Sequence, residues 1–229
     1  MINLVLVLSL SYLVGSIPTS IIVSKWGYGF DIRTKGSGNA GGTNVFRVLG
    51  WKSGLFVMLV DCGKGILATT VVAPLYWSSW LPASTISALD DYTIIQMVCG
   101  GAAMVGHVWT VFAGFKGGKG AATAAGMLVG LAPTEFAVSG SVFFLVMILS
   151  RYVSVGSMAG GTAFPISLLI RHNLLAHEVP GYKTLIFFSI GVAVLLIFSH
   201  RANIKRLIKG TENRISRFSK SKNSQPQES

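Results

Sequence analysis

The chain has 229 residues, of which 51% are hydrophobic and only 12% are charged, and its mean hydropathy is +0.61. Soluble domains carry about 25% charged residues, so this composition leaves too little polar surface for a water-soluble globule. The formal net charge of +11 is spread along the chain rather than gathered in one soluble module, which argues against a nucleic-acid-binding protein. We therefore expect an integral membrane protein.

Apolar segments that could cross a bilayer recur along the whole chain. A transmembrane helix needs about 20 apolar residues, and about seven segments fit, two of them loosely because they are short. The fourth and fifth are separated only by Pro133, so they are either two linked helices or one broken helix, and five or six spans also fit the sequence. The segments are residues 4–24, 53–76, 92–112, 121–132, 134–149, 153–170 and 185–199.

The distribution of basic residues predicts the orientation of these spans. With the N-terminus outside, the outer loops hold only Arg171 and Lys183, while nearly all other Lys and Arg fall in inner loops or in the tail after His200. The positive-inside rule then places the C-terminus in the cytosol. No basic region precedes the apolar run 1–13, so we expect a span there rather than a signal peptide.

Small residues predict how the helices pack. Runs of Gly and Ala at 100–103, 121–126 and 156–161 let helix backbones approach closely. We therefore expect an all-α membrane protein, a compact bundle of about seven transmembrane helices. We expect residues 1–215 to form one transmembrane domain and residues 216–229 to be a polar, disordered cytosolic tail.

The first of three polar, glycine-rich segments on the expected inner face covers residues 35–44 and is followed by Arg47. It contains the G-x-G-x-x-G pattern of dinucleotide-binding proteins, but a transmembrane helix precedes it where that motif needs a strand, so we reject this interpretation. Its glycines expose backbone amides, and an arginine can bind a phosphate through two hydrogen bonds. The alternative is an ordinary interfacial turn with an arginine that only sets topology.

The second segment, residues 114–120, follows Gly106 and His107 and runs into the next apolar helix. It fails the Walker A pattern, so nucleotide hydrolysis is not indicated. A glycine-rich turn that opens a helix still presents amides and a positive dipole end to an anion, and Lys116 and Lys119 add charge. The alternative is a flexible loop with two topology lysines, with His107 a hydrogen-bonded residue at a helix end.

The third segment, residues 200–212, lies at the inner end of the last span. Alone, it also fits a basic amphipathic helix on anionic headgroups. Asp61 and Lys64 stand three residues apart on one face of the second span, as a functional pair or as two charges that neutralise each other. The His-x4-Asp dyad and the G-x-S-x-G motif are absent, so chemistry would depend on positioning and on cations that stabilise phosphates.

Together, the three segments resemble the bacterial membrane acyl-phosphate:glycerol-3-phosphate acyltransferase family (PlsY). The resemblance extends over residues 1 to about 215. The family usually has Pro at the position of Ala40, Ala at that of Gly42 and Pro near Thr110, so we expect a more flexible first loop here. The matching residues are 36–47, 106–107 with 115–123, and 200–207 with Gly210 and Glu212, and Asp61, Lys64, Gly65 and Arg151–Ser154 also look like family features.

The resemblance implies transfer of a fatty acyl group from acyl phosphate to the 1-hydroxyl of glycerol 3-phosphate. The products would be 1-acyl-glycerol 3-phosphate (lysophosphatidate) and phosphate, made for phospholipid biosynthesis at the cytosolic face of the bacterial inner membrane. No cofactor or metal is expected. The implied partners are the two small-molecule substrates, membrane lipid and a transient contact with the soluble enzyme that makes acyl phosphate, with no nucleic acid.

The resemblance also implies the roles of particular residues. The catalytic residues would be His200 and Asn203, with His200 or a phosphate oxygen of the donor as the general base. Arg206 and Glu212 would fix the third segment. The implied substrate-binding residues are Ser37, Asn39, Thr43, Asn44, Arg47, His107, Lys116, Gly117, Gly118, Lys119 and Thr123.

Within this set, Ser37, Arg47 and Lys119 would hold phosphate with help from Lys116. Gly117, Gly118 and Thr123 would offer backbone and hydroxyl donors. Asn39, Thr43 and Asn44 would shape the first segment.

Two other functional classes remain as alternatives. An anion transporter or channel would need charges along a path across the membrane, and only Asp61 and Lys64 lie at depth. A structural membrane subunit would not need three polar glycine-rich segments.

Overall fold

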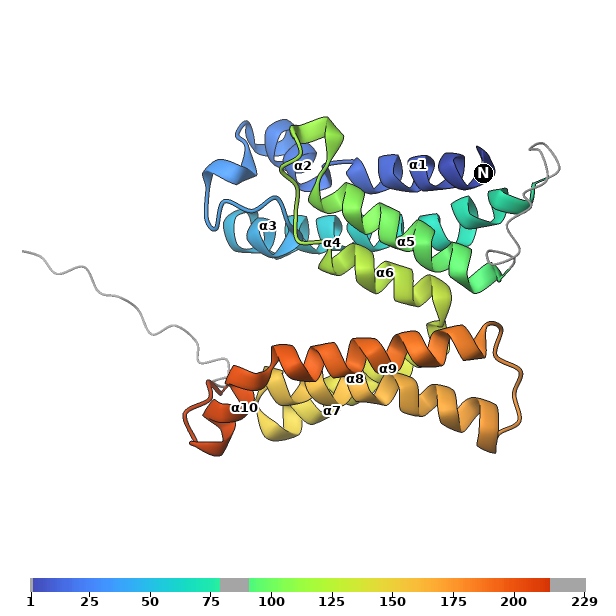
Figure 1. Cartoon of the computed structure of the whole chain (residues 1–229). Helices are drawn as coiled ribbons and strands as arrows, with labels where there is room; N and C mark the ends of the chain where they lie inside the picture. The colour runs from blue at the N-terminus through green and yellow to red at the C-terminus, as the bar shows by residue number, and fades with distance from the viewer. Residues whose placement is uncertain (1, 79–90, 215–229) are drawn as a thin grey trace, which may run out of the picture. The chain divides into compact units, whose positions relative to one another are not determined.

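A computed structural model of the protein describes residues 2–78 and 91–214. Every regular element in these two ranges is a helix, which confirms the prediction of an all-α protein (Figure 1). The chain divides into two compact units at Thr134, and each is described by itself. The predicted tail, 216–229, lies outside the described residues.

Among the described residues, six helical segments are long and apolar enough to cross a membrane. The predicted fourth span is helix α6 (Ala121–Leu131), which has only 11 residues. Such a helix is about 17 Å long, roughly half the hydrocarbon thickness of a bilayer, so the predicted number of seven spans is not confirmed. The six segments are Ile2–Tyr28, Trp51–Trp77, Tyr92–Ala113, Pro133–Ser150, Val153–Leu174 and Tyr182–Ser199.

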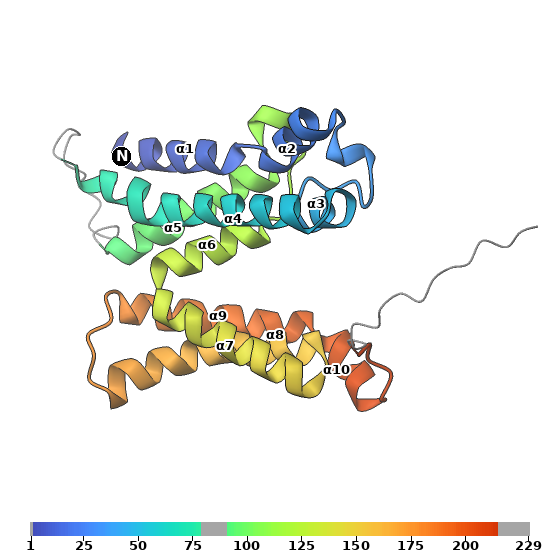
Figure 2. The ribbon, with the colours of Figure 1, turned by 180° about the vertical axis from the view of Figure 1, so that it is seen from behind.

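The first unit places its polar loops together at one end. Both views show α2, α3 and the loop before α6 at the end of this unit that lies away from the N-terminus (Figures 1 and 2). The elements of the unit are α1 (Ile2–Ser16), α2 (Thr19–Tyr28), η1 (Ile32–Thr34), α3 (Gly42–Leu49), α4 (Trp51–Leu67), η2 (Ala68–Val72), η3 (Ala73–Trp77), α5 (Tyr92–Val108), η5 (Val111–Ala113) and α6.

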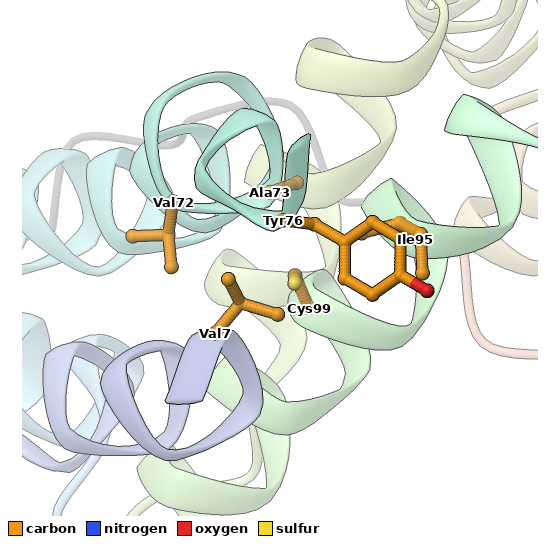
Figure 3. Close-up of a cluster of buried hydrophobic side chains, with 6 residues drawn as sticks. All are labelled: Val7, Val72, Ala73, Tyr76, Ile95 and Cys99. Carbon is orange, nitrogen blue, oxygen red and sulfur yellow. The ribbon is translucent and has the colours of Figure 1, made fainter. Parts of the chain in front are cut away.

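The opposite end of the first unit is an apolar core (Figure 3). Its members come from α1, α4's π-helical and 3-10 extensions, and α5, and each is buried. The side-chain amide of Asn3 donates to the carbonyl of Tyr76 at 3.0 Å and so joins α1 to η3 at this end. The cluster consists of Val7, Val72, Ala73, Tyr76, Ile95 and Cys99.

Glycines bring α4 and α6 into backbone contact. A Cβ atom at Gly126 would lie 1.8 Å from the carbonyl oxygen of Cys62, and one at Gly65 would lie 2.1 Å from that of Thr123. No larger residue fits at either position, as the run of small residues predicts. The start of α6 is thereby held against α4.

A break at Pro18 separates α1 from α2, because proline has no amide hydrogen and ends the regular helical pattern. The carbonyls beside the break therefore lack their helical partners. Side chains from other elements take up these carbonyls. The hydroxyl of Thr110 donates to Ser16 O, and the ammonium of Lys64 donates to Ile17 O. The break is therefore tied to α4 and to the end of α5.

Between Glu135 and residue 214, the described part of the second unit contains three long helices and one short one. Gly156 and Gly160 of α8 lie against the α7 backbone, where an added Cβ would come within 2.9 Å of the carbonyls of Phe143 and Ser139. An ion pair of 2.9 Å joins buried Glu135 to Arg171. The elements are α7 (Pro133–Ser150), α8 (Val153–Leu169), η6 (Ile170–Leu174), α9 (Tyr182–Ser199) and α10 (Arg201–Ile208).

Candidate active site

A cavity of about 430 Å³ opens at the polar end of the first unit. One wall is the first glycine-rich segment with α3, and another is the start of α6. Met58 and Asp61 of α4 and His107 of α5 complete the lining. The predicted substrate-binding residues that line the cavity are Ser37, Asn39, Thr43, Asn44, Arg47, His107 and Lys119.

The side chain of Asn44 holds the first segment in shape. Its Oδ1 accepts a hydrogen bond from the amide of Ser37 at 2.9 Å, and its Nδ2 donates to the carbonyls of Lys35 and Asn39 at 3.1 and 3.0 Å. Asn44 is only 2% exposed, so this amide is committed to the loop rather than to a ligand. Gly36 is left-handed, with φ of 61°, a conformation that favours glycine.

Arg33 connects the first glycine-rich segment to the second. Its guanidinium donates to Asp31 at 2.8 Å and to the carbonyl of Ala113 at 2.9 Å. The hydrogen bond from Arg33 holds the pKa of Asp31 well below its usual range, so Asp31 stays charged and keeps the guanidinium in place. The two segments that face each other across the cavity are thereby fixed to one another.

The amides of Gly117 and Gly118 are not free to bind an anion. They donate to the carbonyls of Val108 and His107 at 3.0 and 3.1 Å, because these carbonyls at the end of α5 lack helical partners. Neither glycine lines the main cavity. The prediction that they present amide donors to substrate is therefore corrected: they let the loop approach α5, since a Cβ at Gly117 would lie 1.9 Å from His107 O.

Lys116 and Thr123 also lie outside the lining of the cavity. Lys116 is exposed on the loop. Thr123 is fully buried, and its hydroxyl has no hydrogen-bond partner among the described residues.

Arg47 and Lys119 are the unpaired cations of the cavity. Both are exposed and both line it. Among residues 2–78 and 91–214, neither forms an ion pair or a side-chain hydrogen bond. Arg33, Arg171 and Arg206, by contrast, each contact a carboxylate. Two cations without partners in one cavity are chemically suited to bind an anion such as phosphate.

A buried polar cluster forms the floor. Lys64 Nζ lies 2.6 Å from Asp61 Oδ1, and His107 Nδ1 lies 3.7 Å from the same oxygen. Asp61 is 2% exposed and Lys64 is 4% exposed, so the pair predicted from the i, i+3 spacing is present. The cavity lining includes Asp61 but not Lys64.

The third segment belongs to the second unit, where Glu212 organises it. Glu212 accepts hydrogen bonds from Asn203 Nδ2 and Arg206 Nε, both at 2.7 Å, and from Ser154 Oγ at 2.8 Å. These hydrogen bonds, first that from Asn203, lower the pKa of Glu212 to about 2. His200 lies at the junction of α9 and α10, with Nδ1 2.8 Å from Leu196 O.

Residues that the sequence predictions missed complete the cavity. Gly41, Gly42 and Met58 line it, and a Cβ at Gly42 would lie 2.4 Å from Met58 Cγ. A side chain at position 42 would have to displace Met58, and the run of glycines was the available signal. The alanines at 121, 122 and 125 on α6 give the cavity an apolar side.

Comparisons with known proteins agree on one family. The family model described as glycerol-3-phosphate acyltransferase matches residues 5–210. The glycerol-3-phosphate acyltransferases of Chlorobaculum tepidum and Chlorobaculum parvum are each 47% identical to this chain, over 94% of it and 98% and 97% of their own lengths.

Solved structures agree as well. Crystal structures of PlsY (YgiH), an integral membrane glycerol 3-phosphate acyltransferase, in its glycerol 3-phosphate and lysophosphatidic acid forms are 31% identical to this chain. They match 93% of it with TM-scores of 0.59 and 0.62, and the match covers 96% and 95% of those chains. This multi-pass membrane protein therefore belongs to the glycerol-3-phosphate acyltransferase family.

Proposed function

We propose that this protein is a glycerol-3-phosphate acyltransferase that moves a fatty acyl group from acyl phosphate to the 1-hydroxyl of glycerol 3-phosphate. The products are lysophosphatidate and inorganic phosphate, and the reaction serves phospholipid biosynthesis. The observation that carries the proposal is the cavity in which Arg47 and Lys119 stand without protein partners. Family membership supports the acceptor and the reaction class.

The chemistry of acyl phosphate fits what the cavity offers. The 1-hydroxyl oxygen of the acceptor attacks the acyl carbonyl carbon, the bond from that carbon to the phosphate oxygen breaks, and the hydroxyl proton leaves with a phosphate oxygen or with a side-chain base. An acyl phosphate has a good leaving group, so this site needs no covalent nucleophile. Binding both phosphates and holding the reacting atoms in line supply the rate enhancement.

The proposed roles follow the positions of the side chains. Arg47, Lys119 and Ser37 bind substrate phosphate, with Asn39 and Thr43 at the rim and Asn44 holding the loop. Both substrates carry phosphate, and one carries an acyl tail. The alanines of α6 offer an apolar side on which the first part of that tail can lie.

His200 and Asn203 are proposed to act at the reacting groups from the start of α10. Asn203 Nδ2 already donates to Glu212, which leaves its Oδ1 to accept from a ligand. His200 Nε2 is the ring nitrogen opposite the one that faces Leu196 O. The proposed domain is a single transmembrane domain formed by residues 1–215.

The proposed topology follows from the distribution of Lys and Arg residues between the loops. The N-terminus lies outside, the polar end of the first unit and α10 face the cytosol, and the protein lies in the bacterial inner membrane. In this topology the short α6 is the fourth of seven crossings. Acyl phosphate reaches the site from the lipid or through a transient contact with the soluble enzyme that makes it.

A donor comparison tests the proposal. Purified protein in lipid is given radiolabelled glycerol 3-phosphate with palmitoyl phosphate, palmitoyl-CoA or palmitoyl acyl carrier protein in separate reactions. We expect labelled lysophosphatidate from palmitoyl phosphate alone. Product from a thioester alone would overturn the donor, and no product from any donor with folded protein would overturn the enzyme.

A further inference from the structure

We infer that Asp61 recognises the 2-hydroxyl of the acceptor and so selects glycerol 3-phosphate over phosphates that lack a hydroxyl at that carbon. The inference rests on the proposed function, because it assumes that the cavity binds the acceptor. It assigns a specificity role to a residue that contributes the one carboxylate among the described residues that line the cavity.

The two oxygens of Asp61 have different surroundings. Both polar contacts of its carboxylate with described residues use Oδ1, which faces Lys64 at 2.6 Å and His107 at 3.7 Å. Oδ2 has no such partner, and it is not among the enclosed unpartnered side-chain atoms of the described residues. Since Asp61 lines the cavity, Oδ2 is the oxygen that remains open to a ligand there.

The side chain is built to stay in place. Only 2% of the surface of Asp61 is exposed. A buried hydrogen-bond acceptor such as Oδ2 costs free energy while it has no partner. Lys64 holds Oδ1 and also the carbonyl of Ile17 at the helix break. The carboxylate cannot rotate away without breaking an ion pair that is itself buried.

Charge and hydrogen-bond type identify the ligand group. The other polar side chains that reach the cavity are mainly donors, above all Arg47 and Lys119, and they suit phosphate oxygens. An ionised carboxylate only accepts hydrogen bonds, and Lys64 offsets its charge, so it does not repel a nearby phosphate strongly. The matching ligand group is a hydroxyl, and the acceptor has one beside the hydroxyl that reacts.

Recognition fits Asp61 better than proton removal. Oδ1 already accepts a hydrogen bond from Lys64 at 2.6 Å, and the side chain is held in the floor of the cavity. The reacting 1-hydroxyl must also lie against the acyl carbonyl, whereas the 2-hydroxyl is free to turn toward the floor of the cavity. An acceptor molecule with a ketone at that carbon would place a carbonyl oxygen against Oδ2. Neither oxygen can donate a hydrogen bond, so we expect the site to disfavour such a molecule.

The test compares acceptors in the full-length protein in lipid with palmitoyl phosphate as donor. One acceptor is glycerol 3-phosphate, and the other is propane-1,3-diol monophosphate, which lacks only the 2-hydroxyl. We expect kcat/KM to be about 10- to 100-fold lower for the deoxy acceptor, chiefly through KM, because a hydrogen bond to a charged group is lost. Equal use of both acceptors by the unaltered protein would overturn the inference.

Two variants and a control complete the test. Asp61→Asn combined with Lys64→Met removes both buried charges at once and should bring the two acceptors within about threefold of each other. Asp61→Asn alone keeps a neutral acceptor and should give an intermediate ratio. Cys62→Ala on the same helix, which lies outside the cavity lining, should leave the ratio unchanged.

The outcomes separate this inference from the proposed function. A variant that loses kcat equally for both acceptors, with an altered pH profile, would identify Asp61 as a base and overturn the recognition role. If the double variant does not fold, the acceptor comparison in the unaltered protein and in Asp61→Asn still decides. Failure of the unaltered protein to acylate glycerol 3-phosphate at all would count against the proposed function instead.

Discussion

The cavity of the first unit and the α10 region of the second unit each depend on one carboxylate, but the two carboxylates are used differently. In the second unit, both oxygens of Glu212 are taken by protein donors from Ser154, Asn203 and Arg206. In the first unit, Lys64 and His107 approach only one oxygen of Asp61. A saturated carboxylate holds a fold together, whereas a half-saturated one in a cavity remains available to a ligand.

The cations of the two regions differ in the same way. Arg206 is paired with Glu212 at 2.7 Å, while Arg47 and Lys119 have no such partner among the described residues. In the proposed complex, bound phosphate is the partner that the cavity cations lack. On this proposal, pairing within the protein separates structural charges from charges that bind substrate.

The largest effect should come from Arg47→Ala. Loss of a charge-assisted contact to phosphate removes about 1.5–3 kcal/mol, so kcat/KM for glycerol 3-phosphate should fall on the order of 100-fold. Lys52→Ala is the matched control, because Lys52 is an exposed cation of α4 that lies outside the main cavity. Equal losses in both variants would break the distinction between cavity cations and other cations.

A smaller effect is expected from Gly126→Ala, which tests how firmly α4 and α6 hold the cavity wall. The added methyl group would lie 1.8 Å from Cys62 O, and overpacking of this kind costs about 1–3 kcal/mol. We expect a midpoint of thermal unfolding several degrees lower, as measured in detergent. Gly63→Ala adds a methyl group with no atom within 4 Å and should be neutral or slightly stabilising; the same loss there would contradict the packing account.

Glu212→Gln should loosen α10 without changing the first unit. The substitution removes the charge that Asn203 and Arg206 hold, so trypsin cleavage after Arg206 and Lys209 should become several-fold faster. Glu178→Gln, an exposed acidic residue of the same unit, should leave the cleavage rate unchanged. Equal trypsin cleavage rates in Glu212→Gln and Glu178→Gln would show that Glu212 does not stabilise α10.

The smallest effect is a pH dependence confined to the same region. The pKa of Glu212 is lowered from 4.5 to about 2 in the folded protein, so its stabilising contribution is complete above pH 4.5 and is lost as the pH falls toward 2. Pepsin cleavage in residues 200–214 should rise over this range relative to Glu212→Gln, which lacks the titration. The same pH profile in both proteins would remove Glu212 as the cause.

Much of the fold could be predicted from hydropathy and charge. The six long spans lie where the apolar runs indicated, because the bilayer sets a minimum apolar length. The fourth predicted segment, residues 121–132, coincides with α6, which begins at Ala121 and ends at Leu131. Its 11 residues are too few to cross a bilayer alone, so the position of this helix was predicted but its crossing is not confirmed.

The candidate site was predictable in part. Polar residue types indicated an anion site, and the three-residue spacing of Asp61 and Lys64 indicated their pair. The use of the Gly117 and Gly118 amides was not visible, because the carbonyls at the end of α5 take them up only when the loop folds back. The approach of His107 to Asp61 joins two helices, and sequence spacing carries no information about such a contact.

The most direct test of the account is a crystal structure of this protein with glycerol 3-phosphate bound. We predict that the phosphate lies between Arg47 and Lys119, within hydrogen-bond distance of both, and that the 2-hydroxyl donates to Asp61 Oδ2. A phosphate bound elsewhere, for instance on the basic residues of α10, with the cavity holding no ligand, would contradict the central claim that this cavity is the substrate site.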